Sequence, residues 1–183
     1  MVDNDILDID FQNKLNKDKI DVELVTTSKF IILSIATFGV YNIWWMYKTW
    51  KVFKEKDGLD IMPAGRAIFA LFFAWGLFDK IQNFSIASGY TKKYSSGLLF
   101  VGYLFCNFLA RLPDPYWLVS FCSIFFLVPP HAAFNYAIEN SNNYNGIHFR
   151  NFNKRQWVLI VLGMFLFFVL LIGFIVPDEE YLY

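Results

Sequence analysis

The stretch RAIFALFFAWGLFDKI, residues 66–81, places twelve uncharged residues between a basic residue and an acid–base pair. Twelve helical residues span about 18 Å, whereas the hydrocarbon core of a bilayer is about 30 Å thick. Two interpretations follow. Either the helix enters a membrane and returns without crossing it, or it crosses a thinned bilayer, with Arg66 reaching back to the headgroups and Ile61 and Met62 adding apolar length.

The composition predicts that lipid is the main solvent of this chain. Of its 183 residues, 56% are hydrophobic and 21% aromatic, and only 17% are charged, whereas about a quarter of a soluble domain is charged. The alternative is an unusually apolar soluble helical domain. A net charge of zero gives no indication of nucleic-acid binding. We therefore expect a lipid bilayer as the principal partner, and no nucleic acid.

Four further apolar runs surround the opening stretch, at residues 30–46, 98–110, 116–128 and 158–176. The last is the clearest candidate for a transmembrane helix, and Pro129 and Pro130 are expected to kink or end the helix before them. We predict an all-α, polytopic membrane helix bundle with four full spans plus one short or re-entrant helix. Five spans are the alternative.

The polar segments define the expected domain boundaries. Residues 1–29 read as a polar, acidic N-terminal tail, residues 30–176 as the transmembrane helical domain, and residues 177–183 as an acidic C-terminal tail. The asparagine-rich stretch 135–156 is expected to be a loop.

The basic residues favour the re-entrant interpretation. Five crossings would place equal numbers of Lys and Arg on the two sides of the membrane, whereas a re-entrant helix over 66–81 leaves only Arg111 outside. This topology puts residues 56–60 and 90–96 together in the cytoplasm. It also puts the N-terminal tail outside.

Aromatic residues next to lysines are typical of the headgroup layer. The expected interfacial anchors are Trp44, Trp45, Tyr47, Trp50, Trp117 and Trp157.

No pattern in the sequence indicates catalysis. The chain contains no P-loop and no dinucleotide-binding glycine pattern, so we expect no enzyme activity, catalytic residue or cofactor. His131 and His148 have no flanking ligand pattern, which predicts two interfacial histidines and no metal site.

Ionisable and amide side chains near lipid are the remaining candidates, because charges are costly at membrane depth. A polar cavity at the short helices would draw on Arg66, Asp79, Lys80, Asn83, Asn107 and Arg111. The alternative is that these residues lie at helix ends and reach water. Asn107 is expected to bond to a neighbouring helix, and Ala67, Ala70 and Ala74 predict a close helix contact.

The stretches TFGVYNIWWMYKTW (37–50), PAGRAIFALFF (63–73) and LPDPYWLVSF (112–121) resemble a family of small bacterial integral-membrane proteins known only as a domain of unknown function. The matching positions are Thr37, Gly39, Tyr41, Trp44, Trp45, Pro63 and Arg66. The resemblance implies a multi-pass protein of the bacterial inner membrane, and it implies no reaction or ligand.

Two function classes follow. The first is a non-enzymatic scaffold or accessory subunit of a membrane complex, whose partners would be a second copy of the chain or other membrane proteins. The second is a small channel or transporter, since broken helices often line polar cavities.

Overall fold

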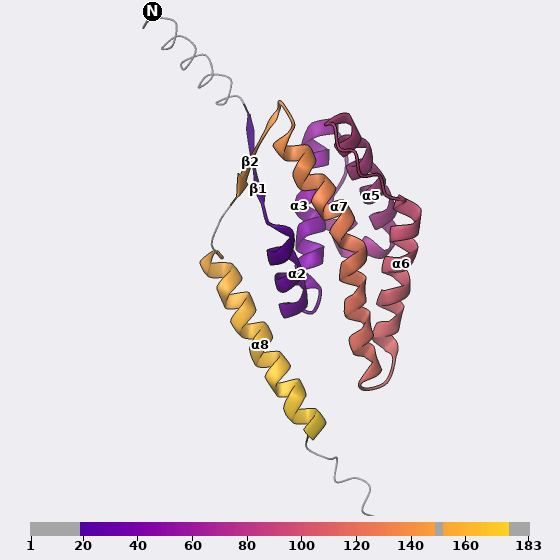
Figure 1. The fold of residues 1–183 in the computed structure, drawn as a ribbon, viewed down its shortest axis with the longest axis vertical. Helices are drawn as coiled ribbons and strands as arrows, with labels where there is room; N and C mark the ends of the chain where they lie inside the picture. The colour runs from indigo at the N-terminus through magenta and orange to yellow at the C-terminus, as the bar shows by residue number, and fades with distance from the viewer. Residues whose placement is uncertain (1–18, 149–151, 176–183) are drawn as a thin grey trace, which may run out of the picture.

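The computed structural model describes residues 19–148 and 152–175, and these are mostly helical (Figure 1). The elements in chain order are β1 (Ile20–Leu24), α2 (Thr27–Ala36), α3 (Val40–Asp57), α4 (Pro63–Ile68), α5 (Ala70–Ala87), α6 (Ser96–Phe108), η1 (Leu109–Arg111), η2 (Tyr116–Cys122), α7 (Ser123–Glu139), β2 (Tyr144–His148) and α8 (Lys154–Ile175).

The prediction of one span over residues 30–46 is wrong, because the chain reverses in the middle of that run. Phe38 and Gly39 both have positive φ angles, 51° and 86°, which end α2 and start α3 in the opposite direction. Phe30 on α2 packs against Trp45 on α3, with ring centroids 5.4 Å apart. The two helices are therefore an antiparallel hairpin, in which α2 is too short to cross a bilayer and α3 carries too many charged residues to do so.

Two segments expected to lack regular structure form a small parallel sheet. Residues 20–24, at the end of the predicted N-terminal tail, pair with residues 144–148 of the asparagine-rich stretch. Residues 20–24 alternate apolar and polar side chains, as a strand with one buried face does, whereas residues 144–148 carry no such alternation. The rest of the predicted tail, residues 1–18, lies outside the described residues, as does the predicted C-terminal tail.

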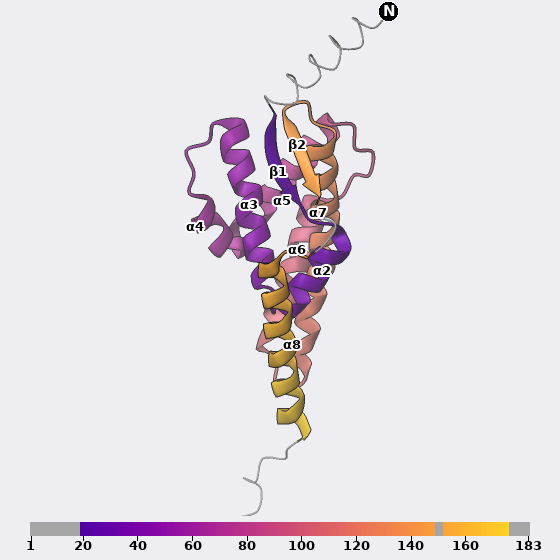
Figure 2. The ribbon, with the colours of Figure 1, turned by 90° about the vertical axis from the view of Figure 1, so that its left-hand side faces the viewer.

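Residues 66–81 also contain a change of chain direction. Helix α4 ends at Ile68, and α5 begins at Ala70. Arg66 lies over the ring of Trp50, and Lys80 reaches Asp57, the last residue of α3. Since α5 thus runs in the same direction as α3, residues 58–62 and 88–95 lie toward one end of the molecule (Figures 1 and 2). Ala67, Ala70 and Ala74 are buried, as the close-contact prediction required.

Helices α6 and α7 form an antiparallel pair joined by η1 and η2. A side chain at Gly102 of α6 would overlap the ring of Phe126 on α7, so the glycine sets how closely the helices approach. Pro129 and Pro130 were expected to kink or to end the helix. They do not end it, because α7 continues to Glu139. Leu127, Pro130 and Ala133 are buried in the core, and this packing holds the helix together across the prolines.

Helix α8 follows β2 and makes a close contact with the rest of the chain at Gly163. A Cβ atom at Gly163 would lie 1.8 Å from the carbonyl oxygen of Ala36 at the end of α2. Further along, Phe167 stacks on Phe38, with ring centroids 4.6 Å apart. The end of the α2–α3 hairpin therefore lies against the middle of the apolar run of α8.

Within the described residues, two helices are long and apolar enough to cross a membrane: Tyr116–Glu139 and Gln156–Gly173. The first combines η2 with α7. The α2 helix and the helix Ser96–Arg111 are apolar but shorter. The prediction of four full spans thus gives way to two candidate spans.

The reversal at Gly39 provides a stability test. We expect Gly39→Ala to destabilise the protein by about 1 kcal/mol, because a Cβ atom disfavours the left-handed conformation. The thermal midpoint in mild detergent would fall by about 2–4 °C. Gly76→Ala is the matched control: Gly76 lies within α5 with open space around its Cα, so the same change should be neutral or stabilising. Equal midpoints for the two variants would contradict this explanation of the reversal.

Candidate functional site

The six residues predicted to form a polar cavity do not come together. Arg66 lies over the rings of Trp50 and Phe73, with its guanidinium carbon 4.7 and 5.3 Å from their centroids. Asp79 and Asn83 are exposed and bond to each other along α5. Each residue has a local partner, which fits the alternative that these side chains stabilise helix surfaces.

The remaining three predicted residues have separate partners. Lys80 pairs with Asp57 at 2.8 Å. Asn107 donates a hydrogen bond to the carbonyl oxygen of Tyr103, four residues earlier in α6, so the prediction of a bond to a neighbouring helix is wrong. Arg111 is exposed in the turn after α6 and lies over Phe108. Neither of the two cavities described below is lined by any of the six.

Two of the predicted interfacial tryptophans are core residues. Trp45 and Trp50 are only 7% and 2% exposed, because the face of α3 that carries them packs against α2 and α4. Trp44 and Trp157 are exposed, as an anchor requires. Trp117 and Tyr47 are half-buried, and Trp117 donates a hydrogen bond to Asp114.

A charged cluster joins the end of α3 to α5. Asp57 accepts hydrogen bonds from Lys80 and Lys56, at 2.8 and 3.2 Å. The hydrogen bond from Lys80 is the largest of the effects that lower the pKa of Asp57, and Lys56 adds to it. Nearby, burial raises the pKa of Tyr144, whose ring meets Phe84 edge-on. These contacts tie α3, α5 and β2 together at one end of the molecule.

The larger cavity, of about 630 Å³, lies between α8 and the α2–α3 hairpin. Its walls are mainly apolar side chains of α3 and α8, and Gly163 and Ala36, which approach closely, both line it. Its polar lining comes from the C-terminal part of β1, the start of α2, the middle of α3 and the start of α8. The polar lining residues are Glu23, Lys29, Thr37, Tyr41, Lys48, Asn153 and Gln156.

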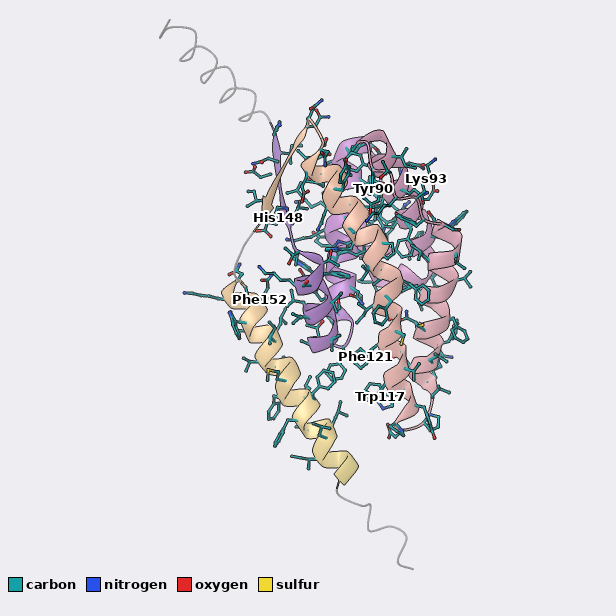
Figure 3. All side chains as sticks on the ribbon, in the orientation of Figure 1. Tyr90, Lys93, Trp117, Phe121, His148 and Phe152 are labelled. Atoms are coloured by element: carbon teal, nitrogen blue, oxygen red, sulfur yellow. The ribbon has the colours of Figure 1, made fainter. Side chains whose placement is uncertain are left out.

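The charged groups of this cavity form one mouth. The Lys48 ammonium pairs with Glu23 of β1 at 2.6 Å, and it lies 5.8 Å from the ring centroid of Trp44. The Lys29 ammonium lies 5.2 Å from the ring centroid of Phe152, which precedes α8. Figure 3 shows Phe152 and His148 at the start of α8 and the end of β2, where this mouth opens, and Trp117 and Phe121 toward the other end of the molecule.

Deeper in the cavity, the polar groups of the chain reversal between α2 and α3 already have hydrogen-bond partners within the chain. The Thr37 hydroxyl donates a hydrogen bond to the carbonyl oxygen of Leu33 and accepts one from the backbone N–H of Tyr41. The cavity is therefore amphipathic, with charged groups at its mouth and apolar side chains within.

A second cavity, of about 200 Å³, lies between β1, α3 and α7. It is lined in part by His131, which is 1% exposed and stacks on Phe30, with ring centroids 4.3 Å apart. The His131 Nδ1 atom has no hydrogen-bond partner among the described residues. His131 is thus a core residue and not an interfacial one, whereas His148 is exposed and pairs with Glu139.

Sequence reasoning missed the larger cavity because it treated residues 30–46 as one helix. The signal was present in Gly39, which follows Thr37 and Phe38 in the middle of that run. A glycine there allows the left-handed conformation that separates α2 from α3.

No protein-family model matches this chain, and the searches of curated proteins and of solved structures gave no match either. The resemblance described above therefore stays a prediction.

The Asp57 cluster predicts a pH dependence of stability. Because the pKa of Asp57 is lowered in the folded state, its contribution is fully present above the unfolded pKa of about 3.9 and is lost as the pH falls through the folded pKa. We expect Asp57→Asn to reduce the slope of unfolding free energy against pH below about pH 5.

Denaturant unfolding in mild detergent at a series of pH values measures this slope. Asp60→Asn is the matched control, because no ion pair of Asp60 is found among the described residues. A slope unchanged by Asp57→Asn, or lowered equally by both variants, would contradict the assignment.

Proposed function

We propose that this protein is a non-enzymatic component of a membrane, held in the bilayer by α7 and α8, that serves as a scaffold or accessory subunit of a membrane complex. The bacterial inner membrane is the proposed location, on the strength of the resemblance given above. Partners would be other membrane proteins or a second copy of the chain.

The observation that carries this proposal is the exposure of α8. Gln156–Gly173 is the most apolar helix of the described chain, yet only 6% of it is buried. A core helix of a soluble protein would be mostly buried. The exposed side chains on α8 include Val158, Val161, Met164, Phe165 and Phe168. A helix with this surface requires an apolar environment.

The distribution of charge supports an orientation for the proposal. The last turns of α3, with Lys51, Lys54 and Lys56, and the loop 88–95, with Lys92 and Lys93, lie toward one end, where Figure 3 labels Tyr90 and Lys93. Exposed apolar residues of α5 and α6, such as Phe72 and Phe105, lie on the helices that lead away from that end. By the positive-inside rule the charged end faces the cytoplasm.

This orientation changes the expected side of the N-terminal segment. Since β1 pairs with β2 and Glu23 pairs with Lys48, residues 20–24 share the side of the lysines that follow residue 46. The expectation of an external N-terminal tail rested on a crossing by residues 30–46, and the reversal at Gly39 removes that crossing.

The transport alternative has less support. A pore requires polar side chains that line one continuous path, and the six predicted residues have separate local partners instead.

Membrane insertion is testable through α8. We expect the wild-type protein to stay with membranes after carbonate washing, and Phe168→Arg to reduce that fraction several-fold, because a charge near the middle of a span costs about 2.5–3.5 kcal/mol. Phe168→Leu is the matched control and should behave as wild type. Release of folded wild-type protein into the soluble fraction would overturn the proposal.

Topology is testable with single cysteines in a chain whose Cys106 and Cys122 are replaced by serine. Cysteines at Asp60, Lys92 and Asn142 should all react with a membrane-impermeant thiol reagent only after the cells are opened. A cysteine at Pro113, in the turn between η1 and η2, should react in intact cells if the short apolar helix Ser96–Arg111 crosses the bilayer beside α7, as this topology requires. If the cysteines at 60 and 92 are labelled from opposite sides, residues 66–81 cross the membrane.

A further inference from the structure

We propose that Arg66 and the exposed apolar side chains around it, in the α4–α5 corner formed by residues 62–75, bind the phosphate and the acyl chains of one membrane phospholipid. This inference deepens the proposed function and rests on the membrane location argued there.

The guanidinium group of Arg66 is held by aromatic rings and has no hydrogen-bond acceptor. Its central carbon lies 4.7 Å from the ring centroid of Trp50 and 5.3 Å from that of Phe73. Ring contacts hold a guanidinium in place but supply no oxygen atom for its five N–H donors. Among the described residues, the Arg66 side chain makes no hydrogen bond or ion pair. Because Trp50 is fixed in the core, the cation is positioned before any ligand arrives.

The nitrogen atoms of Arg66 are accessible to a ligand. The residue is partly exposed, and none of its nitrogens is among the buried, unpartnered polar atoms of the described chain. A planar guanidinium matches two oxygen atoms of a phosphate and stays charged at any physiological pH. The two carboxylates in printed contacts on α3 and α5 have other partners, since Asp57 pairs with lysines and Asp79 bonds to Asn83. The positive charge of Arg66 is thus available to an anionic group.

The side chains around Arg66 fit acyl chains. Met62 and Phe69 lie about one helical turn before and after it, and both are exposed. The corner also exposes Ile68 and Phe72, the latter to 77%. A cation among exposed apolar side chains matches a ligand with an anionic head and apolar tails. A soluble anion would leave the apolar side chains in water.

The pattern of α5 places the corner at the membrane surface. The exposed side chains at the start of α5 are apolar and include Phe72 and Trp75, whereas Asp79 and Asn83 are exposed on the following turns. An exposed tryptophan at such a change is typical of the headgroup layer, where lipid phosphates lie. Figure 2 shows α4 on the outer side of α3, away from α7. Bilayer lipid can therefore reach Arg66 from the side.

Native mass spectrometry of the full chain in mild detergent tests the inference. After delipidation, phosphatidylethanolamine, diacylglycerol with the same acyl chains, or glycerol phosphate is added to separate samples. We expect one phosphatidylethanolamine to be retained per chain, and neither of the other two compounds. Equal retention of diacylglycerol, retention of glycerol phosphate, or no retained phospholipid would each overturn the inference.

Substitutions of Arg66 test the contact with the phosphate. Arg66→Gln should weaken phosphatidylethanolamine retention about tenfold or more, because it removes charge-assisted hydrogen bonds. Arg66→Lys should restore only part of the loss, since an ammonium group lacks the planar fork. Arg111→Gln is the matched control, because the Arg111 guanidinium also lies over a ring, that of Phe108, but in the turn after α6. Equal losses in the two glutamine variants would indicate a general attraction between cations and lipid, and would overturn the inference.

A purely structural role of Arg66 predicts a different result. The thermal midpoint of each variant is measured with and without phosphatidylethanolamine. We expect the lipid to raise the midpoint of the wild type and not that of Arg66→Gln. A rise that survives in Arg66→Gln would overturn the inference.

Carbonate extraction keeps the two proposals apart. Wild-type protein that stays in the membrane but retains phosphatidylethanolamine no better than diacylglycerol would overturn this inference alone. Soluble wild-type protein would overturn the proposed function.

Discussion

The chain reversal at residues 37–39 is the constraint on which the rest of the structure depends. A turn among apolar side chains needs partners for its backbone polar groups, and here the chain supplies them itself. The Thr37 hydroxyl bonds to both Leu33 and Tyr41, and the Gly39 N–H donates to the carbonyl oxygen of Ser34 at 2.8 Å. With these groups satisfied, the ring of Phe38 is free to pack on α8 and η2, against Phe167 and Phe121.

The parallel pairing of β1 with β2 fixes where α8 begins relative to α2, which the chain reversals do not determine. The strands are separated in sequence by α2–α7, yet their register is continuous from Ile20 opposite Tyr144 to Leu24 opposite His148. Each strand leads into a helix, and parallel strands send those helices the same way. The start of α8 is thereby held near the start of α2, at about mid-height of the molecule (Figure 2).

The sequence predicted the helical class, the apolar runs, and the close packing of the alanines at 67, 70 and 74. It could not predict the hairpin over residues 30–46, because hydropathy describes how apolar a run is and does not detect a change of direction within it. The strand over residues 20–24 was missed although its side chains alternate between apolar and polar, whereas residues 144–148 carry no such pattern. Trp45 and Trp50 were assigned to the headgroup layer because buried and interfacial aromatic residues look alike in sequence.

The larger cavity arises where two neighbouring helices of very different length, α2 and α8, diverge from each other. Helix α2 has 10 residues and α8 has 22, and Figure 1 shows α8 crossing α2 at an angle. The helices meet closely at Gly163 and Ala36, because only a residue without a side chain allows that approach. Toward the charged end they separate, while the β1–β2 pair keeps their starting points at a fixed spacing. No side chain among the described residues fills the space between them. Val40 and Leu162, which line this space, are exposed, so it is an open groove between the helices and not a void of the packed interior.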